Sequence, residues 1–256
     1  MSTTIAVAGK GGTGKTSLSG LIIHYLSKMG KGPVLAVDAD ANSNLNEVLG
    51  VEVETTLGEI REELANAELQ DPSPIPPGMS KQDYAEIKFN DALIEMDDYD
   101  MLVMGRTQGH GCYCFVNGLL QTQISKYAGR YAFTVVDNEA GMEHISRGVI
   151  PNVDIILLVS DCSRRGIQAV GRIARLVKSL DLHAKEVKLI VNRAPGGVLS
   201  DGIKEEIALQ ELDLLAVVPQ DELVYQYDTE GKPLVTLPED APVKVAVRDI
   251  IQKIHL

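Results

Sequence analysis

The stretch Gly9-Lys10-Gly11-Gly12-Thr13-Gly14-Lys15-Thr16 decides the fold of this chain. It matches the phosphate-binding pattern GxxxxGK(S/T) and stands between an apolar run and a helical pattern, the context that such a loop requires. Backbone N–H groups of such a loop close around phosphate oxygens, and the following helix adds its positive end. Lys15 reaches the β- and γ-phosphates, while Thr16 supplies a ligand for Mg²⁺. The sequence therefore predicts a P-loop nucleotide site.

Short β-branched runs alternate with helical patterns along the rest of the chain. The predicted strands are Thr4 to Ala8, Val34 to Asp38, Tyr131 to Asp137, Asp154 to Ser160, Val187 to Asn192 and Leu214 to Val218. The predicted helices are Lys15 to Met29, Val116 to Ala128, Arg164 to Leu180, Ser200 to Gln210 and Val243 to Ile254. This order is typical of an α/β fold with a mainly parallel sheet covered by helices on both faces.

We expect one P-loop NTPase domain over residues 1–256, because α/β domains of this length bury a single large core. The only break in composition is DPSPIPPG at 71–78, where four prolines in eight residues cannot continue a helix. We interpret this segment as a surface loop rather than as a domain boundary.

The acidic composition argues against polyanionic partners. With 24 Lys and Arg against 36 Asp and Glu, the formal net charge is -12, which opposes attraction to nucleic acid or to an anionic membrane. Aromatic residues make up 4% of the chain and Trp is absent, so the stacking platforms of a single-strand binder are missing. We therefore expect neither nucleic acid nor a membrane as the main partner.

The N-terminus and the cysteine count indicate the compartment. Residues 1–16 contain a short apolar strand instead of the charged and long apolar regions of a signal peptide, and no apolar run approaches the length of a membrane span. Three cysteines are too few for a disulfide framework. We therefore predict a cytoplasmic protein.

A second lysine, Lys10, lies inside the phosphate loop, where an ordinary P-loop needs no charge. With this residue, GKGGTGKT resembles the deviant Walker A motif of the MinD/ParA/nitrogenase-iron-protein class, which uses ATP. The resemblance implies a nucleotide-dependent homodimer in which Lys10 reaches the partner subunit's nucleotide. A cation inserted in this way stabilises charge on the transferred phosphoryl group, as an arginine finger does.

The same resemblance assigns three aspartates to the switch regions. Asp38 and Asp40 follow the second predicted strand, and Asp137 ends another, so all three stand where open α/β sheets place their ligands. The class implies that Asp40 orients the attacking water, that Asp38 sits near the Mg²⁺ shell, and that Asp137 holds Mg²⁺ through water. A helix-start role remains open for Asp38, because aspartate is a common N-cap.

The residues that follow Asp137 depart from the pattern of the class. Asp137-Asn138-Glu139-Ala140-Gly141 replaces the more familiar glycine-rich run, which leaves the detailed contact with the γ-phosphate open.

Two later loops resemble those that hold adenine and ribose in this class. Asn192 and Arg193 follow one predicted strand, and Pro219, Gln220 and Asp221 follow the last one. The resemblance implies that Asn192 bonds the base edge, although asparagine is also common in turns.

Cys112 and Cys114 form a CxC pair in front of a predicted helix. Two thiols one residue apart provide two soft ligands for a thiophilic metal, which is half of a tetrahedral site. A two-fold dimer would bring two such pairs together and complete the site. His110 is a candidate auxiliary ligand, whereas Cys162 closes an apolar strand and is expected to serve packing.

The loop GKGGTGKT, the DAD of 38–40, and GRTQGHGCYC of 105–114 followed by VNGLL together resemble the CooC-type accessory ATPases of carbon monoxide dehydrogenase maturation. That resemblance implies Ni²⁺ or Zn²⁺ at Cys112 and Cys114 across the dimer, and a metalloenzyme client. The closely similar maturation factors of acetyl-CoA synthase share the pattern.

Two further functions share the fold. An iron–sulfur scaffold or reductase of the nitrogenase-iron-protein type needs two widely separated cysteines per subunit, which the CxC spacing does not match. A cluster bridged by four closely set thiolates nevertheless remains chemically open. A MinD-like positioning ATPase needs a basic amphipathic tail, whereas the ending VKVAVRDIIQKIHL looks like a core helix.

Overall fold

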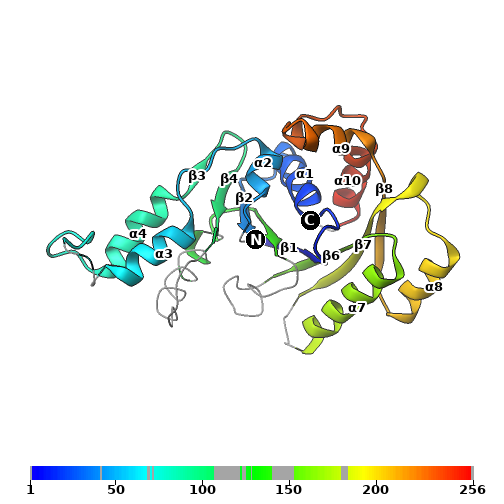
Figure 1. Cartoon of the computed structure of the whole chain (residues 1–256), viewed down its shortest axis with the longest axis horizontal. Coiled ribbons are helices and arrows are strands. Elements are labelled where there is room, and N and C mark those ends of the chain that lie inside the picture. Colours follow the sequence, from blue (N-terminus) through cyan, green and yellow to red (C-terminus); the bar gives the residue numbers. More distant parts are fainter. Residues whose placement is uncertain are drawn as a thin grey trace.

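The computed structural model describes residues 2–40, 42–67, 70, 72–106, 122, 125–127, 129–139, 153–179 and 184–254. Within these ranges one sheet of eight strands has the order β3-β4-β2-β5-β1-β6-β7-β8 (Figure 1). Every neighbouring pair is parallel except β3 and β4, which are antiparallel. The strand that precedes the phosphate loop, β1, therefore lies in the interior of the sheet.

The elements have the following bounds. The strands are β1 Thr3–Gly9, β2 Val34–Ala39, β3 Ile94–Glu95, β4 Asp100–Val103, β5 Phe133–Asn138, β6 Ile155–Ser160, β7 Glu186–Ala194 and β8 Leu214–Pro219. The helices are α1 Lys15–Lys28, α2 Leu45–Leu49, α3 Leu57–Asn66, α4 Lys81–Asp91, α7 Arg164–Ser179, α8 Asp201–Leu209, α9 Glu222–Thr229 and α10 Pro242–Lys253, with 3-10 turns at Pro195–Gly197 and Leu234–Thr236. Among the described helices, none has the length and apolar character needed to cross a bilayer.

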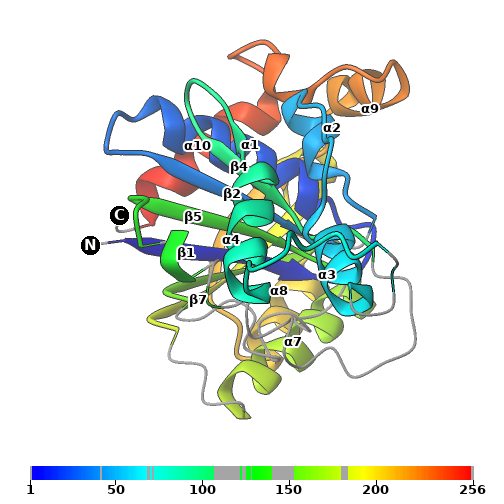
Figure 2. The same cartoon turned by 90° about the vertical axis from the view of Figure 1, so that its left-hand side faces the viewer.

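Two apolar clusters cover the two faces of the sheet, and Figure 2 shows α1 and α10 on one side with α7 and α8 on the other. Alternate residues of β1 supply both clusters, since Ile5 and Val7 pack with α1 and α10 while Ala6 and Ala8 join the opposite cluster. Buried strands in parallel sheets read as continuous apolar runs for this reason. The apolar residues of the strands are thus used for packing, and the site is formed by the polar residues at the strand ends.

The α/β fold class predicted from the sequence is confirmed. The structure contains all six predicted strands, and four predicted helices appear as α1, α7, α8 and α10, with small shifts at their ends. The helix predicted over 116–128 lies mostly outside the described residues. The sequence did not predict α2, α3, α4, α9, β3 or β4, and most of these elements are short. Residues 72–80 join α3 to α4 without helix or strand.

The start of α3 carries a signal that was readable in the sequence. Thr56 Oγ1 accepts a hydrogen bond from the N–H of Glu59, and the Glu59 carboxylate accepts one from the N–H of Thr56. This reciprocal pair is a capping box, which satisfies two helix-start N–H groups. It sets where α3 begins, next to the end of β4, because the N–H of Gly58 also donates to the carbonyl of Met104.

We predict that Thr56→Ala lowers the free energy of unfolding by about 1 kcal/mol, because the N–H of Glu59 loses its acceptor. Urea unfolding followed by circular dichroism measures the change. Thr55→Ala, which removes the neighbouring threonine outside the capping box, is the matched control. Equal stability of the Thr56 variant and the parent protein would contradict the role assigned to the cap.

Candidate nucleotide site

The phosphate loop joins β1 to α1, and two of its glycines cannot be replaced without a clash. A Cβ atom at Gly9 would lie 2.2 Å from the carbonyl oxygen of Val159 on β6. Gly14, the N-cap of α1, has a left-handed backbone with φ of 86°, and a Cβ there would lie 2.4 Å from the Asn192 amide nitrogen. The motif glycines thus allow close contact between the loop and two neighbouring strands.

The start of α1 is prepared for an anion. No described side chain caps its first N–H groups and its first turn contains no acidic residue, so these groups remain available to phosphate oxygens. Lys15 is buried and its Nζ donates a long hydrogen bond of 3.4 Å to the carbonyl of Lys10. The buried Thr13 hydroxyl donates to the same carbonyl at 2.9 Å. The side chain of Lys10 itself is exposed.

Asp137 on β5 offers one carboxylate oxygen without a protein partner. Ser19 on α1 donates to its Oδ1 at 2.9 Å, whereas its Oδ2 is buried and accepts no hydrogen bond from the described residues. Burial raises the pKa of Asp137 to about 6, against the opposing effect of the Thr16 and Ser19 hydroxyls and the Lys15 charge. An orphaned carboxylate oxygen beside Thr16 fits a hydrated Mg²⁺ ion.

Asp38 on β2 is in register with Asp137 and is fully buried. Its Oδ1 accepts from the N–H of Asp40 and its Oδ2 from the N–H of Leu45, the first residue of α2, both at 3.0 Å. Burial, together with the charge of Asp137, raises the pKa of Asp38 to about 7. These contacts give Asp38 a role at the start of α2, while its place in the Mg²⁺ shell stays a prediction.

Asp40 is half-buried and lies in a turn held by its own backbone. Its Oδ1 accepts from the N–H of Asn42 at 2.8 Å, and its carbonyl accepts from the N–H of Ser43 at 3.1 Å. The side chain is thus oriented by the residue two positions further on, as in an Asx turn.

Asn192 and Arg193 tie the end of β7 to the phosphate loop. The buried Asn192 amide donates to the carbonyl of Thr13 at 2.9 Å, and its Oδ1 accepts from the N–H of Arg193. The Arg193 guanidinium donates to the carbonyl of Gly12 at 3.1 Å. Both side chains therefore hold the backbone of the phosphate loop in place, a role that sequence reasoning did not assign to them.

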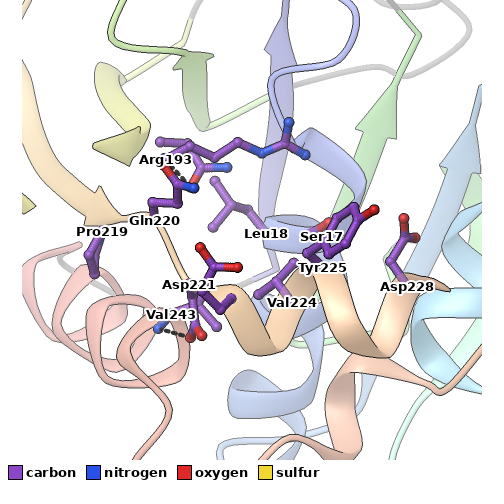
Figure 3. A pocket seen from close by; sticks show the side chains of 12 residues that line it. Ser17, Leu18, Arg193, Pro219, Gln220, Asp221, Val224, Tyr225, Asp228 and Val243 are labelled. Atoms are coloured by element: carbon purple, nitrogen blue, oxygen red, sulfur yellow. Dashed lines mark hydrogen bonds between the residues drawn. The ribbon is translucent and has the colours of Figure 1, made fainter. Parts of the chain in front are cut away.

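A cavity of about 500 Å³ adjoins these residues, and its walls include Leu18, Asn192, Arg193, Gln220, Asp221 and Tyr225. Figure 3 shows Arg193 and Gln220 at one end of the cavity, with Tyr225 and Asp228 following one another along α9. Pro219 also lines it. The residues predicted to surround adenine and ribose therefore meet in one pocket beside α1.

Asp221, predicted to contact the nucleotide, uses both carboxylate oxygens to hold the wall of the cavity. Oδ1 accepts from the N–H of Leu223 at 3.0 Å and caps α9, while Oδ2 accepts from the N–H of Val243 at 3.2 Å in α10. It thereby joins the starts of two helices.

Several residues of the site were missed from the sequence. Ser19 stands one helical turn after Lys15, so helical spacing placed it on the same face. Ser17 and Leu18 line the cavity from α1 for the same reason. Tyr225 carried no signal in the sequence, because its place depends on how α9 packs.

The predicted metal ligands Cys112 and Cys114, with His110, lie outside the described residues, as do Ala140 and Gly141. In the part of the chain that the structure describes, no group of three or more His, Cys, Asp or Glu side chains is arranged to hold a metal ion. Cys162 is half-buried with its thiol 3.9 Å from the carbonyl of Asn192, and burial raises its pKa.

Comparison with known families agrees with this geometry. Residues 4–234 match the family described as the CobQ/CobB/MinD/ParA nucleotide binding domain. The chain belongs to this family of P-loop ATPases, and its mainly parallel sheet with a phosphate loop between β1 and α1 agrees with that assignment.

The similarity to individual relatives extends over most of the chain. An uncharacterized ATP-binding protein of Methanocaldococcus jannaschii is 43% identical over 98% of this chain and 97% of its own length. The carbon monoxide dehydrogenase accessory protein CooC of Rhodospirillum rubrum is 30% identical over 89% of this chain and 87% of that protein. The structure of the septum site-determining protein MinD complexed with Mg-ADP from Pyrococcus horikoshii OT3 is similar with a TM-score of 0.72 at 22% identity, covering 100% and 96% of the two chains.

We predict that the Tyr225 ring stacks on the nucleotide base, since an aromatic side chain that is 70% exposed beside the cavity offers a free face. Tyr225→Ala should weaken ATP binding roughly tenfold, because base stacking contributes about 1–3 kcal/mol. Titration with a fluorescent ATP analogue measures this, and Tyr225→Phe should bind like the parent. Unchanged affinity in the alanine variant would place the base elsewhere.

Proposed function

We propose that this chain is an ATP-hydrolysing metallochaperone that supports nickel insertion into a client metalloenzyme, carbon monoxide dehydrogenase. The observation that carries the proposal is the presence, in one chain, of this ATPase site and of the paired cysteines Cys112 and Cys114. The similarity to the Rhodospirillum rubrum accessory protein, which covers most of both chains, supports the same client.

The donor set of the site fits Mg-ATP. Thr16 would bind Mg²⁺ directly, and Asp137 Oδ2, which has no partner among the described residues, would hold it through water. The loop amides and Lys15 would bind the phosphates, which neutralises part of the charge that develops during transfer. Mg²⁺ supplies the remaining electrostatic stabilisation when it is bound.

Hydrolysis requires a positioned water and a further cation. Asp40 lies on the turn after β2 and would orient the attacking water, as the resemblance to the deviant Walker A class implies. Lys10, exposed on the loop, would contact the nucleotide of a second subunit. ATP binding would thereby favour a homodimer, and hydrolysis would release it.

In this proposal the cargo metal binds between the two subunits. Cys112 and Cys114 from each subunit would provide four thiolates, and a tetrahedral arrangement of four sulfurs suits Zn²⁺ and is accepted by Ni²⁺. If the closed ATP-bound dimer and the metal-bound dimer share one geometry, ATP and metal raise each other's affinity by the same factor.

We predict that Lys15→Ala abolishes nucleotide binding, whereas Lys10→Ala binds ATP but loses hydrolysis by about a hundredfold or more, because a transition-state cation supplied in trans contributes to turnover rather than to binding in cis. Nucleotide titration, ATP turnover and sedimentation with ATP separate the two variants. Lys178→Ala, which removes an exposed lysine of α7, is the control. Parent-like turnover and dimerisation of Lys10→Ala would exclude the proposed role in trans.

We predict that the purified protein binds about one Ni²⁺ or Zn²⁺ per dimer, because two thiolates per subunit make one four-thiolate site. Cys112→Ala or Cys114→Ala should weaken metal binding by at least about a hundredfold, more than the loss of an outer-shell partner. Uptake should release protons and weaken below neutral pH, since free thiols have a pKa of about 8.5.

Sedimentation combined with metal analysis of each species tests this stoichiometry. Cys162→Ala is the matched control, because it removes the remaining cysteine of the chain and should leave metal binding intact. One metal per monomer without a dimer, or undiminished binding in a Cys112/Cys114 double alanine variant, would refute the shared site.

A further inference from the structure

Among the described residues, a hydrogen bond joins the turn that carries Asp40 to a distant part of the chain. The Arg106 guanidinium Nη2 donates to the Asn42 side-chain carbonyl Oδ1 at 2.7 Å, although the two residues are 64 positions apart. Hydrogen bonds with one charged partner are worth more than neutral ones. Because the N–H of Asn42 also donates to the Asp40 carboxylate, this contact acts on the group proposed to orient water.

The backbone that carries Arg106 is fixed from two sides. The N–H of Met104 donates to the carbonyl of Asp38 at 2.8 Å, and the carbonyl of Met104 accepts from the N–H of Gly58 at 2.7 Å. Gly58 approaches so closely that a Cβ on it would lie 2.4 Å from the Arg106 carbonyl oxygen. Arg106 therefore extends from a rigid base formed by the ends of β2 and β4 and the start of α3.

The turn that carries Asp40 and the segment that carries Arg106 differ in how they are held in place. Apart from the anchor to Asp38, the bonds within the turn at Asp40, Asn42 and Ser43 are local, and Ser43 has a left-handed backbone with φ of 51°. Such a turn has little packing of its own, so a bond to a rigid partner narrows its orientations. Arg106 is the described residue that provides this bond at the Asn42 side chain.

We propose that Arg106 is a positioning residue that orients Asp40 through Asn42 for ATP hydrolysis. The proposal rests on the role given above to Asp40.

The test compares the steady-state kinetics of four variants and one control. Arg106→Ala and Asn42→Ala should each lower kcat about tenfold with the KM for ATP unchanged, as expected when one charge-assisted bond no longer orients the turn. The double variant should be no slower than either single one, because both remove the same bond. Arg106→Lys, which keeps the charge, should recover part of kcat. Arg172→Ala, which removes an exposed arginine of α7, should behave like the parent.

Other outcomes separate this inference from the proposed function. If Asp40→Ala turns over ATP at the parent rate, the catalytic role of Asp40 is refuted. If Asp40→Ala is slow but Arg106→Ala and Asn42→Ala are both at the parent rate, the positioning role of Arg106 is refuted. A raised KM for ATP, or additive losses in the double variant, would also contradict it. Should Arg106→Ala fail to fold, Asn42→Ala and Arg106→Lys decide by the same criteria.

Discussion

The site depends on one constraint, which is that contacts from other strands hold the phosphate loop in place. An anion site at the start of α1 needs N–H groups that no protein side chain satisfies, so the loop must be held by its other groups. The Asn192 side chain donates a hydrogen bond to the carbonyl of Thr13, and the Arg193 side chain donates one to the carbonyl of Gly12. Gly9 lies against β6. Contacts within the protein therefore hold the backbone of the phosphate loop in place.

Asp38 and Asp137 are buried carboxylates on adjacent strands, and their different hydrogen-bond partners give them different roles. Asp38 has a backbone N–H donor on each oxygen and holds the Asp40 turn and α2 in place. Asp137 has the Ser19 hydroxyl on one oxygen, and its other oxygen accepts no hydrogen bond from the described residues. Burial raises the pKa of both, so the ionised pair is costly without a cation nearby. The buried Lys15 and the proposed Mg²⁺ offset this cost.

The position of β4 beside β2 brings Arg106 to the turn that carries Asp40. Because β2 and β4 are parallel, their carboxyl ends lie at the same end of the sheet. There the N–H of Met104 donates to the carbonyl of Asp38, and the Arg106 side chain donates to the Asn42 side chain. The same end holds the first turn of α3 through Gly58. A short strand with no distinctive sequence thus determines which parts of the chain contact one another.

The sequence by itself determined the class of fold and the phosphate chemistry, because both depend on local patterns: GKGGTGKT between a strand and a helix, apolar runs at regular intervals, and aspartates after Val37 and Val136. Only the tertiary structure decided the partners of those groups. The brace from Asn192, the caps made by Asp221, the cavity beside Tyr225 and the bond between Arg106 and Asn42 join residues far apart in the chain. Such contacts depend on strand order and helix packing, which no local spacing encodes.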